Sequence, residues 1–279
     1  MTNAPHREDT LARLHLHAVL PALADLAALV PEARQISSTW NFSLRLQLPG
    51  GPAATLVSPG DGTLQVTPGT GTPARLVLNF LSARQLNRTF LNQSALPPLP
   101  TGGFWRILNV RPFVALTKLL DRYLQPMPEA LLDEEFRRVH LRLLFRVLVG
   151  AVPTVAELDP VARHSLTHTP AGLVELRVPS LALVGWMRWT QGLMTSAPGP
   201  APTGTVPDAV ITFTDLPTAD DALLGRLDPN AAVGLGRVDV RGLVPLADGM
   251  SAVMDRVEGY IKPPGSPTIP ALAFSGAAG

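Results

Sequence analysis

The sequence predicts an α+β protein made of two tandem copies of one unit, each with a five-stranded, largely antiparallel or mixed sheet. Three observations support this fold class. Short stretches, such as 42–48 and 208–214, alternate apolar and polar residues as half-buried strands do. Longer stretches, such as 246–261, repeat apolar residues every three or four positions, which is typical of amphipathic helices. Matching residues of the two halves also stand a constant number of positions apart.

In the first half, a helix is expected at 11–30, with a kink or a restart at Pro21. Alternation and the intervening turn residues predict strands at 42–48, 54–57, 63–67, 74–80 and 104–108. Further helices are expected at 82–90 and from Pro112, because the missing N–H of proline is harmless in the first turn of a helix.

The second half repeats this order of elements. An amphipathic helix is expected at 129–149, ended by Gly150, and a hairpin follows at 173–178 and 181–189. A strand at 208–214, a short helix at 219–224, a strand at 237–241 and a helix from Leu246 close the unit. The Pro-rich residues 125–128 mark the boundary, which gives domains 1–126 and 127–262 and a Pro/Gly tail at 263–279.

The two halves can be aligned with one offset. Five pairs of residues are each 133 positions apart: Phe80 and Phe213, Gly103 and Gly236, Ile107 and Val240, Pro112 and Pro245, and Leu124 and Val257. A constant offset across a strand and a helix predicts a tandem duplication.

Composition narrows the classes of function. The chain has 279 residues, of which 46% are hydrophobic and 16% charged, so it can bury a large core. A net charge of +1 does not favour nucleic-acid binding. The absence of cysteine excludes disulfides, thiol catalysis and cysteine-ligated metals. Because we find no signal peptide and no uninterrupted apolar span of about 20 residues, we expect a cytoplasmic protein.

The closing segment carries a resemblance to a known family. It contains G-x-x-D-P at Gly225, Asp228 and Pro229, then G-x-V-x-V-x-G at 236–242, immediately before the last helix. In this order and spacing, Pro207 to Ile261 resembles the C-terminal half of the sterol carrier protein 2 (sterol-binding domain) family. The resemblance implies a curved sheet with helices on one face and, between them, a hydrophobic cavity that holds a lipid.

If the resemblance holds, apolar residues of the second half are candidates for lining such a cavity. These lipid-binding candidates are Met187, Trp189, Phe213, Leu224, Val240, Leu246, Met250, Val253, Met254 and Val257. For each of them taken singly, a packed core is the alternative interpretation. Trp186 is expected on the opposite face of the strand from Met187 and Trp189.

Residues with catalytic or metal-binding chemistry are sparse. His164 and His168 are four apart, as two metal ligands on a helix would be, but no third ligand is indicated near them. No G-x-S-x-G nucleophile elbow and no complete G-x-G-x-x-G motif occurs. We therefore expect a protein that is not an enzyme and carries neither a metal nor a cofactor.

The function expected from the sequence is the non-catalytic binding or transfer of a sterol, fatty acyl or isoprenoid lipid. The alternative is a ligand-free scaffold or dimerisation unit that partners another protein. The expected partner is a hydrophobic small molecule or lipid. A homodimer and transient contact with a membrane are further possibilities.

Overall fold

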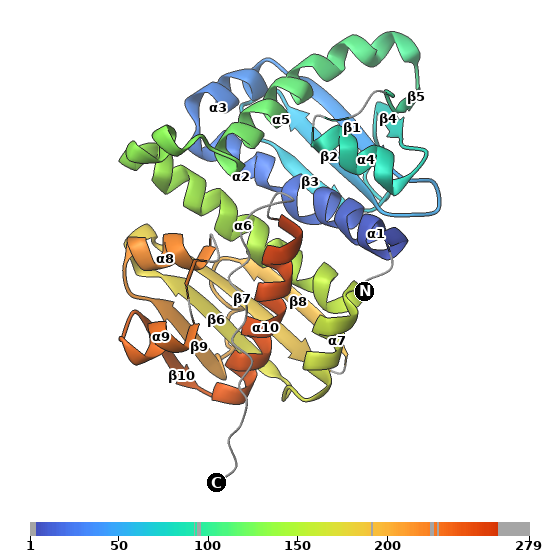
Figure 1. Cartoon of the computed structure of the whole chain (residues 1–279). Coiled ribbons are helices and arrows are strands. Elements are labelled where there is room, and N and C mark those ends of the chain that lie inside the picture. Colours follow the sequence, from blue (N-terminus) through green and yellow to red (C-terminus); the bar gives the residue numbers. More distant parts are fainter. Residues whose placement is uncertain are drawn as a thin grey trace.

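The computed structural model describes residues 4–91, 93, 96–190, 192–223, 226–227 and 229–261. It confirms a mixed α+β protein with one five-stranded mixed sheet in each half. Figure 1 shows the two halves as separate sheets with helices, and the long helix α6 (Glu134–Leu158) running between them.

The first half contributes five α-helices and five strands to the described structure. The helices are α1 (Ala4–Leu14), α2 (Ala22–Leu29), α3 (Pro31–Ser38), α4 (Ala83–Phe90) and α5 (Arg111–Leu124), with a π-helical turn at His15–Val19 and 3-10 helices at Phe104–Val110 and Pro128–Leu132. The strands are β1 (Asn41–Gln47), β2 (Ala53–Pro59), β3 (Gln65–Pro68), β4 (Leu76–Asn79) and β5 (Leu99–Thr101).

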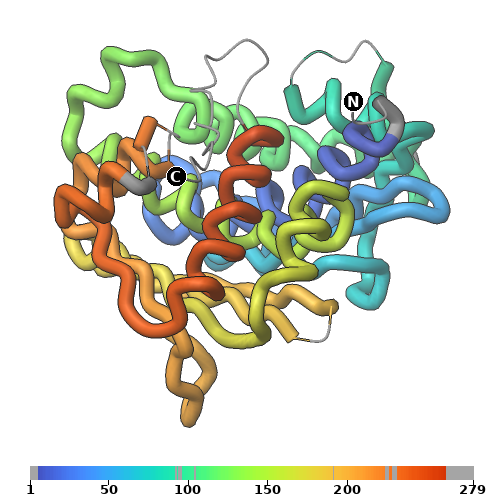
Figure 2. Tube along the Cα trace, turned by 60° about the horizontal axis from the view of Figure 1, so that its bottom comes forward, coloured from blue at the N-terminus to red at the C-terminus, as the bar shows by residue number. Residues whose placement is uncertain are grey.

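The second half repeats the pattern with α6 and five further strands. Its other helices are α7 (Pro160–Thr167), α8 (Leu216–Leu223), α9 (Pro229–Gly234) and α10 (Val244–Ile261), with a 3-10 turn at Pro179–Leu181. Its strands are β6 (Gly172–Val178), β7 (Leu183–Thr190), β8 (Leu193–Pro198), β9 (Ala209–Phe213) and β10 (Val238–Gly242). Figure 2 shows α10 (red) and α7 (yellow-green) side by side across the second sheet.

The two sheets have the same connectivity. Their strand orders are β3-β2-β1-β4-β5 and β8-β7-β6-β9-β10, so each has its first strand in the centre. In both, the first strand is antiparallel to the second and parallel to the fourth, and the fifth strand is antiparallel to the fourth. The tandem duplication that this pattern suggests stays a prediction.

The offset of 133 positions holds for some elements and fails for others. It relates the first residues of β4 and β9 and those of α5 and α10. The strand expected at 104–108 is wrong, because this segment is a 3-10 helix and the fifth strand is Leu99–Thr101. With the fifth strands placed in this way, Gly102 and Gly242 occupy equivalent positions in the two sheets, and both have a left-handed φ. A Cβ would press on the carbonyl oxygen of Arg75 at Gly102 and on that of Asp208 at Gly242.

The predicted end of the long helix at Gly150 is also wrong. Helix α6 continues through Gly150 and Pro153 to Leu158. Gly150 lies inside α6 and faces Ala18, where a Cβ would meet the Cα of Ala18 at an ordinary contact distance of 3.5 Å, so this glycine does not cap the helix. Asp133 caps the N-terminus of α6 by accepting hydrogen bonds from two backbone N–H groups.

Two helical stretches, His6–Leu29 and Glu134–Leu158, are long and apolar enough to cross a bilayer by length and composition alone. Their contacts are those of core helices. They pack against each other around Gly150, and α6 also contacts α10 and the sheet strands β7 and β8. The buried apolar residues of both halves form one contiguous cluster around these helices.

The turn between β10 and α10 tests this account of the glycines. We expect Gly242→Ala to lower the free energy of unfolding by about 3 kcal/mol, because a left-handed φ costs a residue with a Cβ about 1–2 kcal/mol and overpacking costs about as much again. Gly69→Ala is the matched control: Gly69 also has a left-handed φ, but a Cβ there meets no atom within 4 Å. Urea unfolding measures both, and equal losses would contradict the close approach to Asp208.

Candidate functional site

A pocket of about 490 Å³ opens where the end of α6 and the length of α7 face the ends of β7 and β8. Its lining residues come from two helices and the strand ends opposite them: Ala156, Glu157, Arg163, Thr167, Trp189 and Gly192. Its volume lies within the range of roughly 300–1,000 Å³ that is usual for small-molecule sites. It is therefore the candidate binding site.

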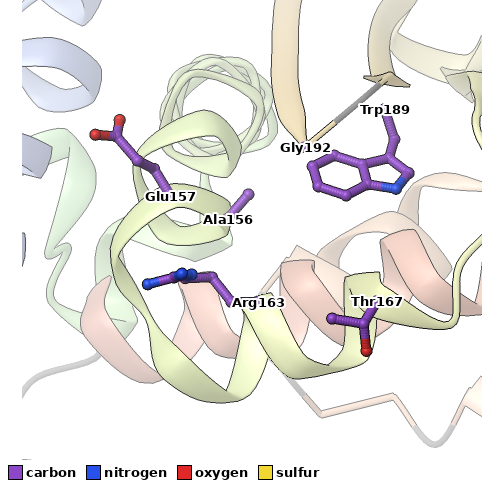
Figure 3. Close-up of a pocket in the computed structure, with 6 residues that line it drawn as sticks. All are labelled: Ala156, Glu157, Arg163, Thr167, Trp189 and Gly192. Carbon is purple, nitrogen blue, oxygen red and sulfur yellow. The ribbon is translucent and has the colours of Figure 1, made fainter.

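Trp189 supplies the aromatic side of the pocket. It stands on the same face of β7 as the buried Met187 and is itself only partly buried. Figure 3 shows its indole reaching from the strand towards Ala156 of α6, with Thr167 of α7 below. An apolar chain laid in the pocket would contact the indole ring and the methyl of Ala156.

Arg163 supplies the charged side of the pocket. Figure 3 shows its guanidinium on the side away from Trp189, the side to which Glu157 also points. The carboxylate of Glu157 is already engaged, because Arg13 of α1 donates to both of its oxygens at 2.9 Å. Within the described part of the chain, the exposed side chain of Arg163 makes no ion pair and no hydrogen bond. The pocket therefore combines an apolar end with a free cation.

A buried aspartate fixes the position of α7, the helix that carries Arg163. The carboxylate of Asp159 accepts hydrogen bonds from the backbone N–H groups of Val161 and Ala162 and so caps α7. It also accepts bonds from Arg256 at 2.8 Å and from the hydroxyl of Tyr260 at 2.9 Å, both on α10. Burial by itself would raise the pKa of this carboxyl, but the donors of Arg256, Ala162 and Tyr260 outweigh burial and hold the pKa below its ordinary value.

The structure places most of the predicted lining residues in the core and not at the pocket. Met187, Leu246, Met250, Val253 and Val257 are fully buried in the core of the second half. Phe213, Val240 and Met254 are partly buried and pack against the same core. Leu224 lies outside the described residues, as do Gly225 and Asp228 of the G-x-x-D-P motif. Trp189 is the predicted residue that borders the pocket.

Sequence reasoning missed the other lining residues. Ala156 and Glu157 lie on the part of α6 beyond Gly150, where the sequence predicted that the helix ends, and Arg163 and Thr167 lie on α7. One signal could have found Arg163: Asp159 followed by Pro160 marks the start of a short helix. That start places Arg163 in the first turn, beside the end of α6.

A second hollow of about 270 Å³ lies where α2 and α3 meet α5 and α6. The rings of Tyr123 and Phe136 stack there with centroids 4.4 Å apart, and the guanidinium of Arg122 lies over Phe136. The carboxylates of Asp133 and Glu135 also line it. This mixture of charges suits an apolar ligand less well than the first pocket does.

His164 on α7 and His168, which directly follows that helix, are both exposed. The rings of His164 and His168 lie 5.5 Å apart, centroid to centroid, and His168 shares a hydrogen bond with Thr167. Among the residues that the structure describes, no group of three or more potential ligands could hold a metal ion.

Comparisons with known proteins give matches to solved structures only; no family model and no curated protein matches the chain. A crystal structure of sterol carrier protein 2 is 20% identical, with 40% of this chain and 93% of that chain covered and a TM-score of 0.32. A ubiquinone synthesis protein, UbiJ-SCP2, is 10% identical over 40% of this chain and 88% of its own, with a TM-score of 0.32.

The stereoselective inverting sec-alkylsulfatase of Pseudomonas sp. is 13% identical, with a TM-score of 0.28. That match covers 62% of this chain but 36% of the sulfatase. The first two structures carry the name of the family that the segment Pro207 to Ile261 resembles. TM-scores this low do not support any statement about the function of this chain.

The network around Asp159 predicts a pH-dependent loss of stability. We expect Asp159→Asn to lower the free energy of unfolding at pH 7 by about 2 kcal/mol, because the substitution removes the charge that strengthens these hydrogen bonds. The loss is no larger because the partner, Arg256, is partly exposed and solvent screens the ion pair. Because the folded-state pKa is lowered, the stability that Asp159 contributes is present above about pH 4 and is lost as pH falls through that pKa.

Urea unfolding between pH 7 and pH 3 should therefore show the wild type and Asp159→Asn converging at low pH. Asp239→Asn is the matched control, because its partner Arg241 is highly exposed and their pair should contribute less than about 1 kcal/mol. A constant difference between wild type and Asp159→Asn at every pH would contradict the account.

Proposed function

We propose that this chain binds a lipid non-catalytically in the pocket between α6, α7 and the ends of β7 and β8. One observation carries the proposal: the pocket has an indole and a methyl group at one end and, at the other, a guanidinium without a partner among the described residues. This arrangement suits an amphiphile with a long apolar chain and an anionic or polar head, such as a fatty acid. The resemblance of Pro207 to Ile261 to the sterol carrier protein 2 family supports the same ligand class.

The affinity would come mainly from the apolar chain. Each methylene group removed from water contributes about 0.8 kcal/mol before the ordering costs of binding. A carboxylate head could accept charge-assisted hydrogen bonds from Arg163, which are stronger than those between neutral groups. In this proposal the chain belongs to the sterol carrier protein 2 family, arose by duplication of one domain and acts in the cytoplasm.

The proposal includes no chemical step. At the pocket, the hydroxyl of Thr167 donates to the backbone carbonyl of His164 and shares a hydrogen bond with Nδ1 of His168, and Glu157 is paired with Arg13. Among the described residues, no side chain is hydrogen-bonded to the other ring nitrogen of His168 and could orient it as a base. Activation of a nucleophile needs a base that is itself oriented by a third group. The described pocket residues supply a binding surface without such a set.

A second function is favoured by the packing of the second half. Five of the predicted lining residues are fully buried in a contiguous core, so the space between the second sheet and α10 is filled by the side chains of the protein. A unit filled in this way could act as a ligand-free scaffold or dimerisation module for another protein. Lipid extraction from the purified protein, followed by mass spectrometry, separates the two functions.

Titration with oleate tests the pocket directly. We expect Trp189→Ala to weaken oleate binding at least tenfold, because the indole is the largest apolar surface of the pocket. The matched control is Trp186→Ala, which removes a partly buried indole from the opposite face of the same strand and should change the affinity less than twofold.

The charged end of the pocket is tested with a neutral ligand of the same chain length. Arg163→Gln should weaken oleate about tenfold and leave oleyl alcohol within twofold, because only oleate carries a carboxylate for the guanidinium. Absence of lipid from the purified protein, together with no oleate binding, would refute the proposed function. Equal effects of Trp186→Ala and Trp189→Ala would place the site elsewhere.

A further inference from the structure

One segment of the first half carries basic residues and no acidic residue. Between Asp61 and Asp121 the sequence carries six basic residues and no aspartate or glutamate. They are Arg75, Arg84, Arg88, Arg106, Arg111 and Lys118. Because the whole chain has 23 basic and 22 acidic residues, the rest of the chain carries an acidic excess. This near-neutral protein therefore has a strongly cationic segment.

The six basic side chains of this segment form no ion pair with the described residues. Arg111 and Lys118 project from the exposed side of α5. Arg106 is held close by, donating to the backbone carbonyl of Arg75 at 2.9 Å. The charge on this surface is thus available to an anionic partner.

Large apolar side chains are exposed on the same surface. Trp105 is 71% exposed, Leu108 is 64% exposed and Leu99 is 53% exposed, although each could bury its side chain in a core. Leu99 lies on β5, the other two lie on the 3-10 helix Phe104–Val110, and these two elements are in contact. Val114 adds a further exposed apolar side chain on α5. Figure 1 places β5 at the end of the first half away from the second sheet.

The segment that carries these residues is anchored to the fold. The indole N–H of Trp40, a buried residue, donates to the backbone carbonyl of Asn109 at 2.9 Å. The ring of Trp105 lies against Gly103, where a Cβ would come within 3.0 Å of the indole. The 3-10 helix is thus tied to the core at Asn109, next to the exposed Leu108.

We propose that this surface, defined by Leu99, Trp105, Leu108, Arg111 and Lys118, docks the protein onto a membrane that contains anionic phospholipids. Tryptophan and leucine insert at the boundary between headgroups and acyl chains, while arginine and lysine attract the anionic headgroups. The absence of acidic residues over 59 consecutive positions gives the charge complementarity. A bilayer accepts scattered protruding side chains without a matching shape, whereas a protein partner needs a packed interface.

Co-sedimentation with vesicles tests the proposal. The full chain should bind vesicles of phosphatidylserine and phosphatidylcholine at low salt, release at high salt, and stay in solution with phosphatidylcholine alone. Arg111→Gln and Lys118→Gln should each lower the partition coefficient about fivefold. Trp105→Ser should lower it about tenfold or more.

Matched controls separate this surface from general stickiness and from the pocket. Leu132→Ser removes an 87% exposed leucine elsewhere, and Arg241→Gln removes a highly exposed arginine elsewhere; both should bind vesicles as the wild type does. Trp189→Ala should also retain vesicle binding, so failure of membrane docking is distinguishable from failure of lipid binding in the pocket.

Two outcomes would overturn the proposal. One is a wild-type protein that stays in solution with phosphatidylserine vesicles at low salt, or whose binding is unchanged by Trp105→Ser and Lys118→Gln. The other is concentration-dependent self-association in sedimentation velocity, without vesicle binding, that Trp105→Ser abolishes. The second result would assign the surface to contact between copies of this chain.

Discussion

The buried carboxylate of Asp159 is the constraint on which the candidate site depends. It stands at the corner where α6 ends and α7 begins, and it is fully buried. A buried carboxylate without partners would be strongly destabilising, so the chain must bring donors to it. Those donors come from the first turn of α7 and from Arg256 and Tyr260 of α10. The hydrogen bonds to the Asp159 carboxylate therefore fix how α6, α7 and α10 are oriented relative to one another. They thereby fix the side of the pocket that α6 and α7 form.

Most strands of the two sheets were predicted because strand alternation is a local property, but β8 (Leu193–Pro198) was not among them. β1 was expected at 42–48 and lies at Asn41–Gln47, whereas the order of the strands, with β1 and β6 in the centre of their sheets, was not predicted. The fifth strand was misplaced because Leu99–Thr101 has three residues, one of them Pro100, and so shows no alternation. The apolar residues after Gly103 belong to a 3-10 helix, which a short apolar run does not distinguish from a strand.

The candidate site was predicted less well than the fold, and the reason is physical. Periodicity identifies which side chains face inward, and Met250, Val253 and Val257 do face inward. It does not say whether inward-facing side chains leave a space or fill it, because that depends on packing between elements far apart in sequence. The pocket lies instead at the edge of the second sheet, where Trp189 on a strand end meets Arg163 on a helix.

The central claim is that an amphiphile lies between Trp189 and Arg163 and leaves the core beneath undisturbed. An NMR titration of the labelled protein with oleate below its micelle concentration tests this most directly, because each tryptophan has its own indole N–H resonance. The account predicts that the indole resonance of Trp189 shifts, while those of Trp40, Trp105 and Trp186 and the methyl resonances of the buried Met187 and Met250 stay unchanged. Shifts of the Met187 and Met250 methyl groups, with the Trp189 resonance unmoved, would contradict it.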